Sequence, residues 1–265
     1  MSHITENVFK SLLIRQLHKN PLIDRSLLTV IYSFNNFGGN INFGLSRACK
    51  FNSPSLTQIL IEKGACDFDW ALQGAGEGGN IDMIWFLIKL NLKHIQALSL
   101  STLSSLDVDD RRIKWEYGLF GACAGGHKDI AQLIINIGCN QFNFGMSGAC
   151  RGGHNDFALW MIQKGANSWD NGLREACCGG YKNTAELMIL MGANNWDVGL
   201  CEACKGGHKD LAELMIKNGA NDWDKALNGA CDHKKKDLSI LMFNYGIKNN
   251  SLAVSTINKF KYFGY

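Results

Sequence analysis

Apolar and polar residues alternate with a helical period in two short stretches of the segment WDVGLCEACKGGHKDLAELMIKNGAN, which starts at Trp196. In the first stretch, Leu200, Ala203 and Cys204 stand at positions i, i+3 and i+4. In the second, an apolar stripe with the letters LAELMI begins at Leu211. Residues at these spacings share one face of an α-helix. The pattern therefore predicts a pair of short helices.

The same pattern recurs along the chain. An alanine stands at the same place in each copy, and five of the six spacings between these alanines are 27 residues, while the sixth is 47. Self-similarity at a fixed period is typical of a solenoid, in which each unit is stabilised by stacking on its neighbours. Seven units are enough for a stable array. The marker residues are Ala48, Ala75, Ala122, Ala149, Ala176, Ala203 and Ala230.

The residues between the stripes predict where the helices begin and end. Aspartate is a favoured helix cap, so Asp170, Asp197 and Asp224 are expected to cap the first helices. Glycine weakens regular structure except at caps and turns, so the 29 glycines are expected at helix ends, as in the Gly-Gly turn at 206–207. Where each second helix ends, a glycine is expected in the left-handed conformation. These glycines are Gly138, Gly165, Gly192, Gly219 and Gly246.

The run GLxxACxGGHKDxAxLMIxxGAN resembles the ankyrin repeat in its paired small residues, its Gly-His turn, its apolar second helix and its closing Gly-Ala-Asn. The resemblance covers roughly residues 41–249 and recurs in register. Ankyrin repeats usually have a period of about 33 residues and a TPLH opening, whereas this chain reads VGLC, NGLR or FGMS there. The missing residues, about six, fall where the family carries its β-hairpin finger. The resemblance implies an all-α, ankyrin-like solenoid of helix pairs with shortened or absent fingers.

The shortened unit that starts with tryptophan also looks like the ankyrin arrays that large DNA viruses encode in multiple copies, particularly viruses that infect amoebae. This resemblance implies a viral protein in the host cytoplasm, with a place in the virion as the alternative. Some viral ankyrin proteins pair the array with a ubiquitin-ligase adaptor motif. The segment NPLIDRSLLTVIYSF, which starts at Asn20, is faintly similar to such a motif.

Three segments fall outside the regular repeat. Residues 1–40 contain two apolar stretches split near Pro21 and are expected to form a helical cap. A 20-residue insertion lies within about 91–114. It is either a binding feature or a tolerated surface bulge, because loop entropy grows slowly with loop length. Residues 250–265 are expected to form a last capping helix and an aromatic tail that packs back or meets a partner.

Composition narrows the classes of function. The chain has 265 residues, of which 46% are hydrophobic and 19% charged, as is typical of a globular protein. A formal net charge of +3 is too small to indicate nucleic-acid binding, which needs clustered Lys and Arg. No apolar run approaches the ~18 residues of a membrane helix, and no export signal is recognised. We therefore expect a soluble cytoplasmic protein whose ten cysteines are reduced.

Candidate chemical sites follow the repeat and do not form a separate motif. Zinc needs four ligands, or three and a water, and packed helices lie about 10 Å apart, so Cys-x-x-x-His pairs in adjacent units cannot share an ion. The Gly-rich run at Gly74 lacks the strand of a dinucleotide loop, and DVDD at Asp107 lacks the glycine and glutamate of a calcium loop. No nucleophile has a recognisable base. We expect no metal, no cofactor and no enzymatic activity. The Cys-x-x-x-His pairs are Cys123/His127, Cys150/His154 and Cys204/His208.

The function that these observations favour is protein binding by a rigid array. Stacked repeats present a preorganised surface, which limits the entropy lost on binding. A concave face lined by the first helices is expected to hold a host or viral protein, in a chain that is a monomer or associates with itself. The alternatives are a structural component that packs on itself or on other viral proteins, and a ubiquitin-ligase substrate adaptor. The candidate partner-binding residues are polar positions that vary between units: Arg151, Arg174, Glu175, Glu202, Lys205 and Asp232.

Overall fold

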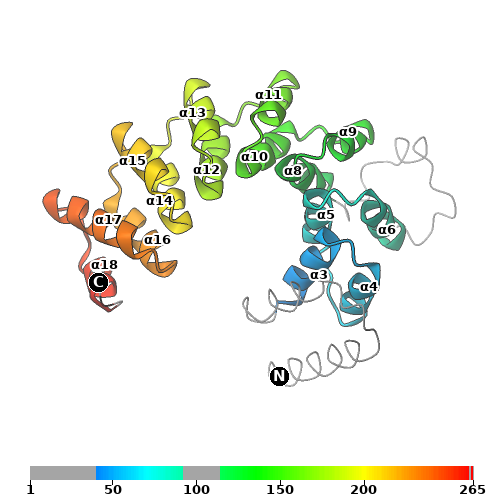
Figure 1. Cartoon of the computed structure of the whole chain (residues 1–265), viewed down its shortest axis with the longest axis horizontal. Helices are drawn as coiled ribbons and strands as arrows, with labels where there is room; N and C mark the ends of the chain where they lie inside the picture. Colours follow the sequence, from blue (N-terminus) through cyan, green and yellow to red (C-terminus); the bar gives the residue numbers. More distant parts are fainter. Residues whose placement is uncertain (1–39, 92–113, 263, 265) are drawn as a thin grey trace. The chain divides into compact units, whose positions relative to one another are not determined.

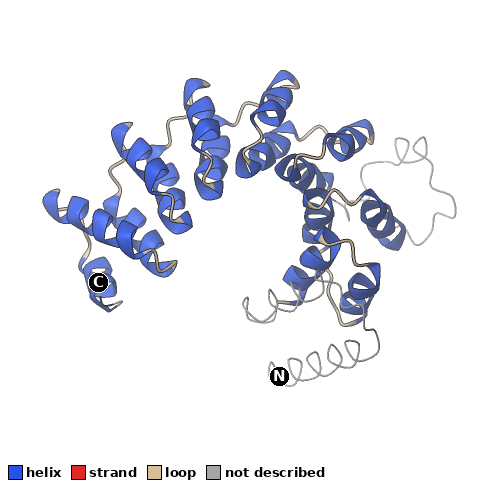
Figure 2. Ribbon diagram, in the orientation of Figure 1, coloured by secondary structure: helices blue, strands red, loops and turns tan. Residues whose placement is uncertain are grey.

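The structure is a computed structural model that describes residues 40–91, 114–262 and 264. These residues form short α-helices joined by tight turns (Figure 1). Within the described ranges there is no β-strand (Figure 2). The predicted all-α array of helix pairs without β-hairpin fingers is therefore confirmed. Residues 1–39 of the predicted N-terminal cap and residues 92–113 of the predicted insertion lie outside the described residues.

The helices alternate between a first and a second helix of each pair. The first helices are α3 (Ile41–Lys50), α5 (Phe68–Glu77), α8 (Trp115–Gly125), α10 (Phe142–Gly152), α12 (Trp169–Gly179), α14 (Trp196–Gly206) and α16 (Trp223–Asp232). The second helices are α4 (Pro54–Glu62), α6 (Ile81–Asn91), α9 (Lys128–Asn136), α11 (Asn155–Gln163), α13 (Lys182–Leu190), α15 (Lys209–Lys217) and α17 (Lys236–Lys248). Helix α18 (Val254–Tyr262) follows the last pair.

The contacts between helices divide the chain into two compact units. The first contains the described residues up to Ala122 together with Asp129–Gly138, and the second contains Cys123–Lys128 and the described residues from Cys139 onward. In the first unit, α3 packs against α4 and α5, and α5 packs against α6. In the second unit, the first helices pack on one another in chain order from α10 to α16, and α18 packs on α16. Figure 1 shows α10, α12, α14 and α16 in one row and α11, α13 and α15 in a neighbouring row.

Small residues allow neighbouring first helices to approach closely. Ala203 and Cys204 of α14 are completely buried, as are their counterparts in α10, α12 and α16. Gly199 lies inside α14, and a Cβ atom there would lie 2.6 Å from the Sδ atom of Met215. Atoms do not pack so closely, so a larger residue here would force the Met215 side chain to move, and glycine avoids this despite its cost in a helix. The expectation that glycines occupy only helix ends and turns is therefore wrong.

The turn between the two helices of a pair requires glycine for two reasons. Gly207 has a φ of 87°, in the left-handed region, and directly follows α14, while His208 is the N-cap of α15. At the equivalent Gly180, a Cβ atom would lie 2.5 Å from the Cε1 atom of His208. The ring of one repeat thus packs onto the turn of the preceding one. Backbone conformation and packing both select glycine here.

The left-handed ends of the second helices are confirmed at all but one of the predicted positions. Gly246 lies inside α17, which continues to Lys248, and the left-handed residue there is Asn250, with a φ of 51°. Leu252 packs where a side chain of Gly246 would lie, so a tertiary contact explains this glycine. The confirmed positions have φ between 110° and 116°: Gly138, Gly165, Gly192 and Gly219.

An acceptor in the first turn of the first helices fixes the position of the next repeat. The Oδ1 atom of Asp197 accepts hydrogen bonds from the backbone N–H groups of Asn221 (2.7 Å) and Asp222 (2.9 Å), in the loop that precedes α16. We call this pair of bonds the first-turn clamp. Asp170 and Asn143 make the same two bonds one and two repeats earlier. In the first unit, Asn42 does so.

The prediction that Asp170, Asp197 and Asp224 cap their own helices is therefore wrong. The cap of α14 is Asn195, which accepts a bond from the N–H of Val198, and the cap of α16 is Asp222. Both the cap and the clamp are polar acceptors near a helix start. Whether such an acceptor caps its own helix or binds the next loop depends on where the next repeat lies.

Replacing Asp197 with alanine should lower the free energy of unfolding by about 1–2 kcal/mol, because two backbone N–H groups lose a charged acceptor. Replacing it with asparagine should cost less, since Asn143 makes the same two bonds with a carboxamide. Urea unfolding followed by circular dichroism measures both changes. An equal cost for D197A and D197N would contradict the clamp.

Candidate protein-binding surface

Three positions of each first helix in the second unit vary in character from pair to pair. They are the third, sixth and tenth residues of the helix, whose i, i+3 and i+7 spacing places them on one face. We call them the variable stripe. All except the buried Cys201 are exposed or half-exposed. The stripe consists of Phe144, Ser147 and Arg151 on α10; Asn171, Arg174 and Cys178 on α12; Val198, Cys201 and Lys205 on α14; and Lys225, Asn228 and Asp232 on α16.

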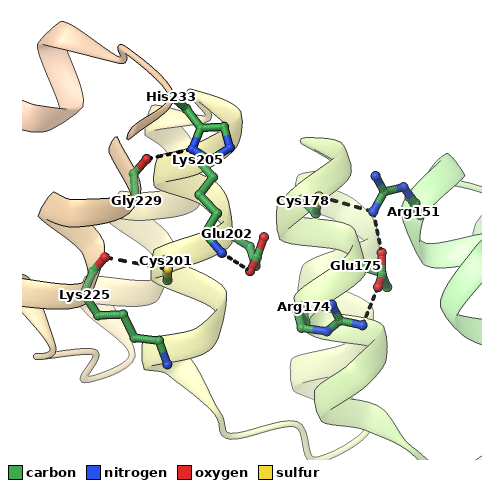
Figure 3. A network of polar contacts seen from close by, with 10 residues as sticks. All are labelled: Arg151, Arg174, Glu175, Cys178, Cys201, Glu202, Lys205, Lys225, Gly229 and His233. Atoms are coloured by element: carbon green, nitrogen blue, oxygen red, sulfur yellow. Dashed lines mark hydrogen bonds and ion pairs between the residues drawn. The ribbon is translucent and has the colours of Figure 1, made fainter. Parts of the chain in front are cut away.

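Two arginines of the stripe share one buried carboxylate. Arg151 Nη1 lies 2.8 Å from Oε2 of Glu175, and Arg174 Nη2 lies 2.5 Å from its Oε1 (Figure 3). Arg151 also donates to the Sγ atom of Cys178 at 3.3 Å. The Glu175 side chain is 6% exposed, whereas those of Arg151 and Arg174 are 46% and 44% exposed. A buried carboxylate needs such partners, because the cost of removing it from water must be offset by charge-assisted hydrogen bonds.

Helix α14 carries a second pair with the same layering. Lys205 Nζ lies 2.8 Å from Oε1 of Glu202, and their side chains are 37% and 18% exposed (Figure 3). The hydrogen bond that Lys205 donates to Glu202 raises the pKa of Lys205, so the ammonium group stays charged at neutral pH. The Sγ atom of Cys201 donates to the carbonyl of Lys225 on the neighbouring helix, which explains why this stripe position is buried.

Two further ion pairs follow the repeat register and were missed in the sequence. Asp232 pairs with Lys259 at 2.6 Å, and in the first unit Lys50 pairs with Glu77 at 2.9 Å. The members of each pair are 27 residues apart. Comparing residues one period apart would have found both pairs. Lys259, Lys50 and Glu77 carry no such signal within a single repeat.

The structure sorts the six predicted residues into three groups. Arg151, Arg174 and Glu175 form one cluster, Glu202 binds Lys205, and Asp232 binds Lys259. Glu175 differs from the others because it is buried beneath the two arginines and orients them, instead of facing outward. The binding of a partner by these residues stays a prediction.

Four recurrent cysteines are packing residues in this structure. Burial raises the pKa of Cys123, Cys150, Cys177 and Cys204 to about 12. Such thiols are protonated at neutral pH and are poor nucleophiles and metal ligands. All ten cysteines of the chain are free thiols.

The other candidate sites do not assemble in the part of the chain that the structure describes. There, no three His, Cys, Asp or Glu side chains come together in a way that could hold a metal ion. Gly74 lies inside α5, as the repeat register predicts, and not in a phosphate-binding loop. The acidic run at 107–110 lies outside the described residues. None of the described helices combines the length and apolar character needed to cross a membrane.

Among the comparisons with known proteins, the one with solved structures gives matches. No protein-family model matches the chain, and no curated protein matches it. Among solved structures, the ankyrin repeat domain of human ASB11 is similar, with 20% sequence identity and a TM-score of 0.42. The match covers 66% of this chain and 83% of the human domain.

The buried thiols predict how stability depends on pH. The folded chain keeps these protons up to about pH 12, whereas an exposed thiol in the unfolded chain loses its proton near its ordinary value of 9.0. The free energy of unfolding should therefore be unaffected below pH 9 and fall above it, by about 1.4 kcal/mol per pH unit for each buried thiol. Urea unfolding between neutral and alkaline pH measures this slope.

The variant C204A should lose stability less steeply above pH 9 than the unmodified chain, because it has one buried thiol fewer. The matched control is C66A, since Cys66 is exposed. An identical alkaline slope for C204A and the unmodified chain would rule out this coupling.

Proposed function

We propose that the protein is a non-enzymatic, ankyrin-like scaffold that binds a protein partner through the variable stripe of its first helices. The observation that supports this proposal is the contrast between fixed and variable positions within α10, α12, α14 and α16. Their eighth and ninth residues are always a buried alanine and cysteine, while the stripe positions change in size and charge. A fixed scaffold with a variable exposed face is the arrangement by which repeat proteins bind partners. Because the helices are held by stacking, the stripe loses little entropy on binding.

The resemblance to the arrays of large DNA viruses favours a host or viral protein as the partner, met in the host cytoplasm. The segment that is faintly similar to a ubiquitin-ligase adaptor motif lies outside the described residues. Substrate delivery to a ubiquitin ligase is kept as an alternative consequence of the same binding.

Bulky substitutions on the stripe should remove the partner. The variant N171W/K225W adds two large side chains at exposed stripe positions and alters none of the ion pairs described above. Affinity purification of the tagged chain from host cells, followed by mass spectrometry, should recover the partner with the unmodified chain and at least about tenfold less with this variant. The control N183W/E213W places the same bulk at exposed positions of α13 and α15 and should retain the partner. Loss with both variants, or with neither, would contradict binding by the stripe.

Self-association is the second candidate function, and α18 carries the observation that favours it. Val254 and Tyr262 are 73% and 86% exposed at the end of the described array. Phe260 of the same helix, by contrast, is buried and stacks on Phe243 with 4.2 Å between ring centroids. Large apolar groups at the end of a stack of repeats suit a contact with another copy. Residues 263 and 265 of the predicted aromatic tail lie outside the described residues.

If the chain assembles through α18, light scattering should show a molar mass that rises with protein concentration in the micromolar range. The variant V254S/Y262S should then remain at the mass of one chain. A constant monomer mass for the unmodified chain would count against assembly and would leave partner binding by the stripe unaffected.

A further inference from the structure

The charges on α10, α12 and α14 are arranged in layers. The cations Arg151, Arg174 and Lys205 are 46%, 44% and 37% exposed, whereas the carboxylates that they bind are 6% and 18% exposed. A partner that approaches this part of the stripe therefore meets three cations above two carboxylates, a group of five side chains with one excess positive charge. Asp170 and Asp197 of the same helices lie in the first turns, where they bind the loop of the next repeat. Figure 3 shows the carboxylates of Glu175 and Glu202 held on the cationic groups.

The end of the row formed by α16 and α18 has the opposite layering. There, Asp232 is the more exposed partner, at 53%, and Lys259 is 32% exposed. Exposed cations above more deeply buried carboxylates are thus found on α10, α12 and α14, whereas α16 carries the exposed Lys225 and the exposed Asp232. This layering is not a general property of the first helices, although the ion pairs themselves recur along the row.

The cationic groups are also held in position. Arg151 and Arg174 bind different oxygens of one carboxylate, so both guanidinium groups are fixed around the same buried anchor. A guanidinium group has five N–H donors, and Arg151 binds Glu175 through Nη1 while Arg174 binds it through Nη2. The other nitrogens of Arg174 suit an incoming carboxylate. Fixed cations lose less entropy on binding than mobile ones.

The spacing of the cations indicates the form of the ligand. The two arginines make one subsite, and Lys205 lies on the next first helix, about 10 Å away for packed helices. An extended peptide advances about 3.3–3.6 Å per residue. Carboxylates three residues apart in an extended segment would therefore match the two subsites.

We propose that the surface formed by Arg151, Arg174 and Lys205 binds an acidic segment of the partner, extended across α10, α12 and α14, with Asp or Glu at i and i+3. This inference rests on the proposed protein-binding function and names the chemistry of the partner.

The test selects phage-displayed random short peptides on the full immobilised chain and measures the affinity of the enriched peptides by fluorescence anisotropy. Hydrogen exchange of the chain with bound peptide locates the site independently of charge. We expect peptides that carry carboxylates three residues apart and protect α10, α12 and α14. Replacing both carboxylates with amides should weaken binding about tenfold, as expected for the loss of several ion pairs.

A neutral triad provides the decisive variant. In R151Q/R174Q/E175Q, the excess charge is removed while amides replace the ionic hydrogen bonds, so no buried charge is left unpaired. This variant should bind the acidic peptides with about tenfold lower affinity. The matched control D232N/K259Q neutralises an ion pair of the same row outside the proposed site and should bind them unchanged. Circular dichroism establishes that both variants are folded.

The outcomes separate this inference from the proposed function. Peptides that protect these first helices without an excess of acidic residues, or that bind the neutral triad equally well, would overturn the acidic partner and leave protein binding by the stripe intact. Peptides that protect only the second helices, or the selection of no peptide, would count against both. Tighter binding of a single-stranded oligonucleotide, lost in the neutral triad, would replace the acidic protein segment with nucleic acid.

Discussion

Close contact between neighbouring first helices is the constraint on which the rest of this structure depends. A pair of short helices cannot bury its apolar face alone, so each repeat is stabilised by the next. The contact is possible because the facing positions are alanine and cysteine, while Gly199 leaves room for Met215 of the second helix α15. These small residues contribute little apolar area each. Their value lies in bringing backbones together, so that the larger second-helix side chains can pack around them.

Once the helices are in contact, the backbone loops must meet in register. The first-turn clamp supplies this register, because one oxygen of Asp197 or its counterpart binds two N–H groups of the following loop. The glycine turns do the same on the other side of the repeat, where the ring of His208 packs on Gly180. Each repeat is thus held to the next by apolar packing, by hydrogen bonds to the backbone and by ring contact. The third, sixth and tenth positions of α10, α12, α14 and α16 vary from repeat to repeat, and among them Cys201 takes part in these contacts by donating to the carbonyl of Lys225 on the next first helix.

The variable stripe acquires its chemistry from the same periodicity. Side chains one period apart face one another across neighbouring helices, which is why Asp232 meets Lys259 and Arg151 meets Cys178. Arg151 also reaches Glu175, which stands three residues before Cys178. Which member of an ion pair is more exposed then depends on the position that each residue occupies in its helix. Glu175 and Glu202 stand one position before the marker alanine and lie deeper than the cations they bind. A row of ion pairs can therefore present a cationic surface at one place and not at another.

The sequence by itself determined the helix pairs, the period of 27 residues, the glycine turns and the absence of room for a β-hairpin finger, because each follows from local periodicity and backbone conformation. Only the tertiary structure decided that Asp197 clamps the next repeat and does not cap its own helix, that Gly246 lies inside a helix, and that Glu175 is buried beneath two arginines. These three features depend on what the neighbouring segment places opposite the residue. A local pattern does not contain that information, since an aspartate near a helix start or a glutamate beside a small residue reads the same in either setting.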